Sequence, residues 1–571
     1  MKTVLCALHS QYIHSALALW YLKAAAEAWC RLPQEVAVLE ATVNQPEEEV
    51  LDRLLRERAD VLAFSCYIWN ITTVKSLIAS LAERTPGVRI LLGGPEAGFR
   101  AQELLEELPA VWGIQIGEGE RSFAALLDRL AAGEAADGID GLCYRKEGRI
   151  VLRPASRQTE DPPSPYTPDY LAALKGRIAY LETSRGCPFS CAFCLSGREE
   201  TVRFFEMGRV KRDILLVANS GAQTVKLVDR TFNCRPDRAK ALFRFLLEQR
   251  GRGIPEGVRF HFEVAADLFD EEAIALLNGA PRGFFQLEAG LQSFHRPTLE
   301  AVTRKTDLDR LCRNLRRLLA PGNLHMHIDL IAGLPYEDFS TFAQSFNRAY
   351  ALHPHMLQLG FLKFLYGSRL RAQAAEWGYQ FSADPPYACT QSRWLTEEEL
   401  RRLAGIEDAL ERLYNSGRFR CTLAYLLKHT GWTPFDLLDK TASFLGEQGE
   451  TAGVSLDDYT ARVYRGFSSF PGVDPARLRD VMACDCLMSS RNGRLPPCLQ
   501  VEDRRLGRLK RELAVREGKG TRRGVAILYS LGGRAVAADY THPPDPITTR
   551  YALHWAVPAF GGDEARADPR G

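Results

Sequence analysis

Residues 187–194 read Cys187-Pro-Phe-Ser-Cys191-Ala-Phe-Cys194, shortly after the apolar stretch Ile178-Ala-Tyr-Leu-Glu-Thr183. The apolar stretch predicts a β-strand, so the cysteines lie on a loop at its carboxyl end. Three thiolates cannot complete a tetrahedral zinc site without a fourth ligand. They suit a four-iron cluster whose fourth iron stays open to a substrate or cofactor. A zinc loop that borrows a distant Cys or His is the alternative.

Strand and helix patterns alternate on both sides of this motif. Residues 177–375 are expected to form a partial or full parallel β/α barrel, in which catalytic residues lie at the carboxyl ends of the strands. Six strands are predicted there, at 178–183, 224–228, 259–263, 284–287, 325–330 and 356–361.

The first 135 residues predict a separate α/β domain, a Rossmann-like doubly wound sheet that binds ligands at the carboxyl ends of its strands. Its strands are expected at 3–8, 35–40, 61–65, 89–93 and 113–116. Residues 136–176 read as a hairpin followed by a Pro-rich linker. Residues 376–571 predict a mainly helical C-terminal extension, with a helix opened by Thr396-Glu-Glu-Glu and a strand pair within 525–538.

Composition narrows the class of protein. The 571 residues exceed what one hydrophobic core usually holds. The net charge of +2 gives no reason to expect nucleic-acid binding. No apolar run is long enough for a transmembrane helix, and the first residues do not resemble a signal peptide. We therefore expect a cytoplasmic protein whose scattered cysteines are mostly reduced core residues.

The cysteine triplet, with Ser184-Arg-Gly before it, resembles the signature of the radical S-adenosylmethionine (SAM) superfamily. There the open iron binds the amino and carboxylate groups of SAM, which is cleaved to a 5′-deoxyadenosyl radical. Later stretches extend the likeness, including Glu288-Ala-Gly-Leu-Gln292-Ser293, and Arg304 is placed to pair with the SAM carboxylate. Asp229 stands where relatives carry a Gly-Gly-Glu-type turn, which is absent here. The resemblance implies these SAM contacts: Phe193, Asp229, Glu263, Glu288, Gln292, Ser293 and Arg304.

A doubly wound domain before such a barrel resembles the cobalamin-binding radical SAM proteins. Three loops carry the likeness, after the third, fourth and fifth strands, and their small residues allow close approach of the backbone to a ligand. The resemblance implies that these loops, with the loop after the first strand, surround a corrinoid through Tyr12, His14, Ser65, Cys66, Tyr67, Gly93, Gly94, Pro95, Glu96, Gly117, Glu118 and Gly119.

One loop departs from the family pattern. Cobalt-ligating domains carry Asp-x-His-x-x-Gly, whereas here His14 has Tyr12 at the Asp position and Leu17 at the Gly position. The carboxylate that would orient a ligating imidazole is missing. We predict that no histidine ligates cobalt, and that His14 starts a helix or contacts the corrin edge.

The resemblance implies a cobalamin-dependent radical SAM methyltransferase that acts on an unactivated carbon. Its cofactors would be a [4Fe-4S] cluster, SAM and cobalamin, with an external reductant of the flavodoxin or ferredoxin type. No residue identifies the small-molecule or peptide substrate, and no catalytic residue is assigned. The alternatives are a cobalamin-using cyclase or rearrangement enzyme, a non-catalytic sensor, and a methylthiotransferase with a second cluster on Cys6, Cys30 and Cys66.

The C-terminal extension resembles an uncharacterised extension of one cobalamin-type subfamily, through Tyr366-Gly-Ser-Arg-Leu and Pro385-Pro-Tyr387. We expect it to cover the barrel mouth and exclude solvent. Cys484-Asp-Cys486 with Cys498 predicts either a further metal site or ordinary core thiols.

Overall fold

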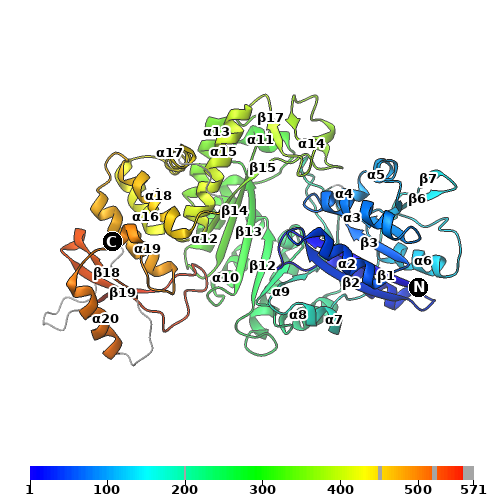
Figure 1. Cartoon of the computed structure of the whole chain (residues 1–571), viewed down its shortest axis with the longest axis horizontal. Helices are drawn as coiled ribbons and strands as arrows, with labels where there is room; N and C mark the ends of the chain where they lie inside the picture. The colour runs from blue at the N-terminus through cyan, green and yellow to red at the C-terminus, as the bar shows by residue number, and fades with distance from the viewer. Residues whose placement is uncertain (198–200, 448–452, 517–523, 557–571) are drawn as a thin grey trace.

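A computed structural model describes residues 1–197, 201–447, 453–516 and 524–556. Figure 1 shows the N-terminal domain at one end, the barrel in the middle and the C-terminal extension at the other end. Among the described residues, no helix is long and apolar enough to span a membrane.

The N-terminal domain is built on a seven-stranded sheet of order β2-β1-β3-β4-β5-β6-β7. Its parallel strands are β1 (Lys2–His9), β2 (Glu35–Thr42), β3 (Val61–Ser65), β4 (Arg89–Gly93) and β5 (Val111–Gln115). Apolar side chains of α2 (Glu47–Glu57), α3 (Ile71–Arg84) and α5 (Ala101–Glu107) pack on one face. Those of α1 (Leu17–Trp29) and α6 (Glu120–Ala131) pack on the other. The predicted doubly wound sheet is confirmed.

The hairpin β6 (Leu142–Lys146) and β7 (Arg149–Leu152) belongs to this sheet, although the sequence pattern places it in the linker. β6 pairs antiparallel with β5, with Ile114 opposite Cys143. The hairpin therefore covers the edge of β5, because an unpaired edge exposes unsatisfied backbone groups.

The barrel is open, with six parallel strands in the order β15-β14-β13-β12-β11-β8. They are β8 (Ile178–Leu181), β11 (Thr224–Leu227), β12 (Arg259–Val264), β13 (Phe285–Gln292), β14 (His325–Ala332) and β15 (Met356–Phe361). β13 continues past its predicted end at Leu287. The prediction stopped there because partly exposed residues, mostly polar, alternate with buried apolar ones and interrupt the apolar run, although the strand itself continues.

The C-terminal extension begins with α15 (Glu397–Leu410), which Thr396 and Glu399 cap reciprocally as predicted. Four more helices follow: α16 (Arg420–Thr430), α17 (Pro434–Glu447), α18 (Leu456–Ser468) and α19 (Pro475–Ser489). The chain then forms α20 (Arg504–Arg516) and a sheet of β18 (Gly524–Leu528), β19 (Arg534–Ala538) and β20 (Leu553–Ala556).

The helices of the extension contact the barrel at the end opposite its mouth, whereas its first residues reach the mouth, where the Tyr379 hydroxyl donates to the Gly333 carbonyl. The expected cover over the mouth stays a prediction. Asn415 bonds the backbone of Leu357, and the Tyr414 hydroxyl donates to the Pro354 carbonyl. These contacts lie at the amino end of β15, opposite the mouth. The part that reaches the carboxyl end is residues 362–391, named here the bridging segment, which contains α14 (Arg369–Ala372), β16 (Gln380–Phe381) and β17 (Cys389–Gln391).

Candidate active site

The three cysteines lie on one loop after β8, at the carboxyl end of the barrel, as predicted. Cys187 and Cys191 are buried, whereas Cys194 is partly exposed. The Cys187 Sγ lies 3.5 Å from the Thr231 hydroxyl, and the Arg304 Nη1 lies 3.6 Å from the Cys191 Sγ. In the described ranges, no three His, Cys, Asp or Glu side chains are arranged as a ready-made set of metal ligands.

Neighbouring elements hold the cysteine loop in place. The Ala192 N–H donates to the Val302 carbonyl at 2.9 Å, and the Ala192 carbonyl accepts from the Leu370 N–H at 2.9 Å. The Arg369 guanidinium donates to the Ser190 carbonyl and to the Thr303 hydroxyl. The loop is therefore fixed between the segment after β13 and the bridging segment.

Asp229 is fully engaged within the protein. Its buried carboxylate accepts from the Thr183 amide at 3.1 Å, from the Thr183 hydroxyl at 2.7 Å and from the Ser184 hydroxyl. Burial raises the pKa of Asp229, partly offset by these bonds. The predicted SAM contact is thus corrected, because this carboxylate instead anchors the start of the cysteine loop.

The barrel lumen is charged, whereas closed barrels are usually filled by branched apolar side chains. Glu263 of β12 stands beside Glu288 of β13, and Glu288 beside His327 of β14. Lys226 of β11 lies 3.1 Å from the Glu288 carboxylate and 3.6 Å from that of Glu263. The His261 Nε2 lies 2.8 Å from Glu288. The predicted residues Glu263 and Glu288 therefore share one cation.

These neighbours set the charge of the lumen. Burial alone would raise the pKa of Glu288, but the His261 hydrogen bond and the Lys226 charge lower it to about 2. Burial, together with the carboxylates of Glu288 and Glu263, raises the pKa of Asp329 to about 8. At neutral pH the lumen thus holds an ionised Glu288 and a protonated Asp329.

Several polar atoms near the carboxyl ends of β13 and β14 have no partner in the part of the chain that the structure describes. They are the Gln292 Oε1, the Arg304 Nε and the Asp329 Oδ1, all buried. A buried polar atom without a partner is costly, so a bound molecule is the expected partner. Gly290 lies beside them, and a Cβ there would displace the end of the Gln292 side chain. These residues fit a polar ligand such as SAM.

Ser293 does not belong to this group, which corrects a second predicted SAM contact. It is fully buried, and its hydroxyl donates to the Glu337 carboxylate at 2.6 Å and accepts from the His295 N–H at 2.9 Å. Burial raises the pKa of Glu337 to about 7, although Ser293 and Ser345 donate to it. Ser293 therefore braces the loop after β13. Phe193, next to Cys194, packs half-buried against the barrel core.

In the N-terminal domain, the loops after β3 and β4 interlock. The Cys66 N–H donates to the Gly93 carbonyl at 2.7 Å, and the Glu96 N–H donates to the Cys66 carbonyl at 3.2 Å. Gly94 has φ +92°, and a Cβ there would lie 2.6 Å from the Cys66 oxygen, so only glycine fits. The Cys66 thiol is fully buried and donates to the Phe64 carbonyl, so its predicted contact with a corrinoid is wrong.

Aromatic rings stand at the carboxyl edge of this sheet. Tyr67 stacks on Trp69 with ring centroids 4.3 Å apart, and the Trp69 Nε1 donates to the Leu8 carbonyl. Tyr12 and Trp69 are 73% and 48% exposed, which is unusual for large rings. This edge therefore offers flat apolar surface for a planar ligand.

His14 bonds across the domain boundary. Its Nδ1 lies 2.7 Å from the Tyr180 hydroxyl of β8, and burial lowers its pKa. The other histidine of this domain, His9, is buried 3.8 Å from the Glu40 carboxylate. His14 precedes α1, as predicted for a residue near a helix start.

Carboxylates predicted to surround the corrinoid join the two domains. Glu118 accepts from Arg185 and from Arg203, each at 2.6 Å, and Glu120 accepts from Arg185 at 2.6 Å. Glu96 is 3% exposed and accepts from the Tyr387 hydroxyl of the bridging segment. The predicted corrinoid contact of Glu96 is therefore corrected, whereas that of Glu118, whose side chain is 34% exposed, stays a prediction.

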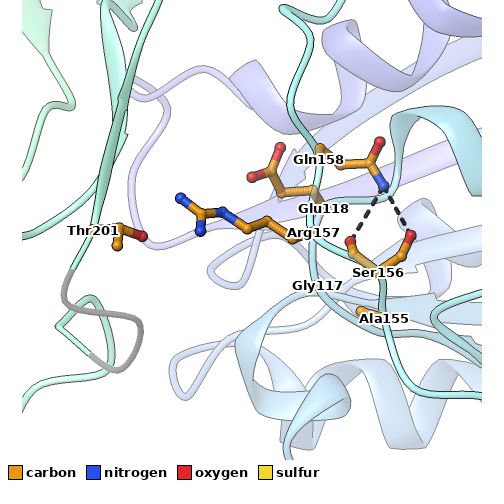
Figure 2. A pocket seen from close by; sticks show the side chains of 7 residues that line it. All are labelled: Gly117, Glu118, Ala155, Ser156, Arg157, Gln158 and Thr201. Atoms are coloured by element: carbon orange, nitrogen blue, oxygen red, sulfur yellow. Dashed lines mark hydrogen bonds between the residues drawn. The ribbon is translucent and has the colours of Figure 1, made fainter.

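The loop after β5 also borders a pocket of about 330 Å³ (Figure 2). Gly117, with φ +75°, and Glu118 form one side, residues 155–158 of the linker form another, and Thr201 lies opposite. The Arg157 side chain extends across it toward Thr201. Gly119 lies outside the pocket, and a Cβ there would come within 3.3 Å of Gln115 and Leu22 in the domain interior.

Among the residues that the structure describes, the other cysteines singled out by the sequence do not gather into a further metal site. Cys6 and Cys66 pack on one face of the N-terminal sheet and Cys30 on the other, which separates the three thiols that a methylthiotransferase would need. Cys484 and Cys486 are two residues apart on α19 and so face different ways, Cys484 toward the C-terminal sheet and Cys486 toward the main core beside Cys498. Burial raises the pKa of both to about 12, as expected of core thiols.

Sequence reasoning missed several residues of this site, for different reasons. Arg185 lies inside the quoted signature, yet its partners are 65 and 67 residues away. Lys226 reads as one residue of a short strand, and only its register beside Tyr180 and His261 shows that it faces inward. Trp69 was a detectable signal, because it follows Ser65-Cys-Tyr67 by two residues.

Three family models match the chain. They are the B12 binding domain over residues 4–127, the radical SAM superfamily over residues 181–349, and a protein family of unknown function, DUF4080, over residues 375–521.

Curated proteins with similar sequences include two methyltransferases. The cobalamin-dependent radical SAM methyltransferase TokK of Streptomyces tokunonensis is 31% identical over 52% of this chain and 45% of its own length. The 2-(S-pantetheinyl)-carbapenam-3-carboxylate methyltransferase of Streptantibioticus cattleyicolor is 31% identical over 50% of this chain and 44% of its own length. The chain thus spans about half the length of these relatives.

A solved structure shares the fold. The radical SAM methyltransferase TsrM of Kitasatospora setae, solved with tryptophan and a SAM analogue, superposes with a TM-score of 0.56 at 17% identity. The match covers 70% of this chain and 81% of that one. This likeness shows that the two chains share a fold.

Proposed function

We propose that this chain, which joins a B12-binding domain to a radical SAM domain, is a cobalamin-dependent radical SAM enzyme that methylates an unactivated carbon. The observation that carries the proposal is that the carboxyl edge of the barrel sheet lies against the carboxyl edge of the N-terminal sheet. Arg185, two residues before Cys187, binds Glu118 on the loop after β5. The cysteine loop and the ligand-binding edge of the B12-binding sheet are thereby held against each other.

When bound, the cluster and SAM supply a 5′-deoxyadenosyl radical, and cobalamin supplies the methyl group. Cys187, Cys191 and Cys194 would hold the cluster, and Arg304 lies beside Cys191 where it can pair with the SAM carboxylate. The unpartnered Gln292 Oε1 can accept a hydrogen bond from SAM. These residues position and orient the cluster and SAM, since the cofactors carry the difficult chemistry.

The edge formed by Tyr12, Tyr67 and Trp69 would hold the corrin ring through flat apolar contact. Gly93 and Gly94 allow backbone to approach it closely. Glu96 acts on this site indirectly, through the contact that fixes its loop, and Glu118 is a predicted contact.

The lumen supports a substrate with several hydrogen-bonding groups. Lys226 on β11, Glu263 on β12 and the protonated Asp329 on β14 offer a cation, an acceptor and a donor on the same sheet. The relatives' names point to diverse methylated compounds, so we assign no single substrate. We place the activity in the cytoplasm, with an external flavodoxin- or ferredoxin-type protein as electron source.

Anaerobic reconstitution with iron and sulfide tests the proposal. The expected result is four irons per chain, one bound cobalamin, and release of 5′-deoxyadenosine on addition of SAM and dithionite. Eight irons without cobalamin would point to a methylthiotransferase. Four irons and cobalamin without SAM cleavage, even with a cell extract as substrate source, would favour a sensor.

A further inference from the structure

The bridging segment contacts the N-terminal domain through a buried hydrogen bond. The Tyr387 hydroxyl donates to the Glu96 carboxylate, and the two side chains are 1% and 3% exposed. The residues are 291 positions apart in sequence. Figure 1 shows α14 and β17 of this segment at the side of the barrel that faces α4 (Pro95–Gly98).

Tyr387 is itself fixed to the barrel. The Phe364 N–H donates to the Tyr387 carbonyl at 2.9 Å, and the Cys389 N–H donates to the Leu362 carbonyl at 2.9 Å. Leu362 follows β15 directly. The position of the Tyr387 hydroxyl is thus set by the last barrel strand.

A second contact lies beside the first. The guanidinium groups of Arg100 and Arg371 lie over the Tyr366 ring, 4.5 and 3.7 Å from its centroid. Phe99 packs against Gly367, where a Cβ would come within 2.5 Å of the ring. Desolvated contacts of this kind contribute more than exposed ones. The bridging segment therefore grips both ends of the short stretch from Glu96 to Arg100.

Glu96 passes this constraint to the loops predicted to face the corrinoid. It follows Gly93-Gly94-Pro95 directly, and its N–H donates to the Cys66 carbonyl on the loop after β3. Gly94 and Cys66 are in close contact, so the two loops are packed tightly against each other. Two of the four loops around the site thus depend on one tyrosine of the segment after the barrel.

We propose that Tyr387 is a positioning residue for cobalamin, and that the bridging segment is a clamp holding the loops after β3 and β4 in their cofactor-binding arrangement. The inference rests on the proposed function. It gives a specific task to the bridging segment, whose residues 375–391, Tyr387 among them, belong to the matched region of unknown function.

The test is a double-mutant cycle on the full chain with Tyr387→Phe, Glu96→Ala, which removes the acceptor, and the double variant. Hydroxocobalamin is titrated into each protein and binding is followed by absorbance. Loss of a hydrogen bond to a buried carboxylate should raise the Kd for Tyr387→Phe about tenfold. The double variant should bind no worse than the weaker single variant, because both changes remove one interaction. Dithionite-driven SAM cleavage by the reconstituted cluster should change less than about twofold.

Tyr414→Phe is the matched control. Its hydroxyl is also buried and donates to a backbone carbonyl of the barrel, but at the opposite end. Its cobalamin Kd should equal that of the wild type. Equal Kd values for Tyr387→Phe and wild type, additive effects in the cycle, or an equal rise in Tyr414→Phe would each overturn the clamp. Absence of cobalamin binding by the wild type would instead refute the proposed function.

Discussion

The Arg185 guanidinium binds the Glu118 carboxylate at 2.6 Å, across the boundary between the barrel and the B12-binding domain. The same guanidinium binds Glu120 at 2.6 Å and Glu182 at 3.0 Å. One partly buried cation thus balances carboxylates from both domains, two residues before the first cysteine of the cluster loop. The predicted sites of two cofactors share this one side chain.

Arg185→Ala should therefore weaken both sites. Removing the cation leaves three carboxylates without their shared partner, and breaking a buried pair costs about 3 kcal/mol or more. We expect the melting temperature to fall by about 5–10 °C, with lower iron and cobalamin content. Calorimetry and metal analysis of the anaerobically purified protein measure both.

Arg203→Ala is the control for this prediction. Arg203 also binds Glu118, at 2.6 Å, but it has no bond to Glu120 or Glu182 in the part of the chain that the structure describes. Removing the Arg203 side chain leaves Arg185 in place. The fall in melting temperature and in cofactor content should therefore be less than half as large as for Arg185→Ala. Equal losses in the two variants would contradict a special role for Arg185.

The second prediction concerns Asp329, whose pKa burial and the nearby carboxylates raise to about 8. In the unfolded chain this carboxyl ionises near pH 4. Between these values the folded state holds one more proton, so the stabilising contribution falls by up to about 1.4 kcal/mol per pH unit as pH rises, and is lost above 8. Asp329→Asn cannot ionise. Its melting temperature relative to wild type should therefore rise steadily from pH 5 to pH 8.

Asp270→Asn is the control, because the pKa of Asp270 is shifted in the opposite direction to that of Asp329. The Lys240 hydrogen bond lowers the pKa of Asp270, the residue that caps α10 (Glu271–Asn278). Its contribution is present above pH 4 and is lost as pH falls through the lowered pKa. The difference between Asp270→Asn and wild type should thus be constant between pH 5 and pH 8. A pH-independent difference for Asp329→Asn as well would refute the raised pKa.

The strands and domain order were predictable because each follows from a local pattern. The apolar pattern predicted both the first and the last residue of β15 correctly. The Cys187 triplet, which follows an apolar strand, placed the site at the carboxyl end of that strand. The roles of Asp229 and Ser293 were not predictable, since a motif reports a position and not the partner. The Asp229 carboxylate accepts a hydrogen bond from the Thr183 hydroxyl, and the Ser293 hydroxyl donates one to the Glu337 carboxylate. No local pattern links Glu96 to Tyr387, because the pairing depends on how two domains meet.

The third prediction concerns the lower face of cobalt. His14 bonds Tyr180 and His9 lies beside Glu40, so neither imidazole is expected to bind the metal. Electron paramagnetic resonance of the Co(II) state should show no nitrogen splitting that changes on labelling histidine with ¹⁵N. His14→Gln should leave the spectrum unchanged. A splitting that responds to the label and disappears in His14→Gln would contradict this expectation.

The last prediction separates the cluster thiols from those on α19. Cys187→Ala, Cys191→Ala and Cys194→Ala each remove one of three ligands, so reconstituted protein should hold well under four irons per chain and release no 5′-deoxyadenosine. Cys484→Ala and Cys486→Ala remove thiols that pack on different sides of the helix, so they should keep four irons and SAM cleavage. Their cost should be limited to about 1–2 kcal/mol of stability from a small cavity. Iron analysis and absorbance near 400 nm measure the cluster. If the wild type held more than four irons per chain and Cys486→Ala lost the excess, a second metal site in the C-terminal extension would be present instead.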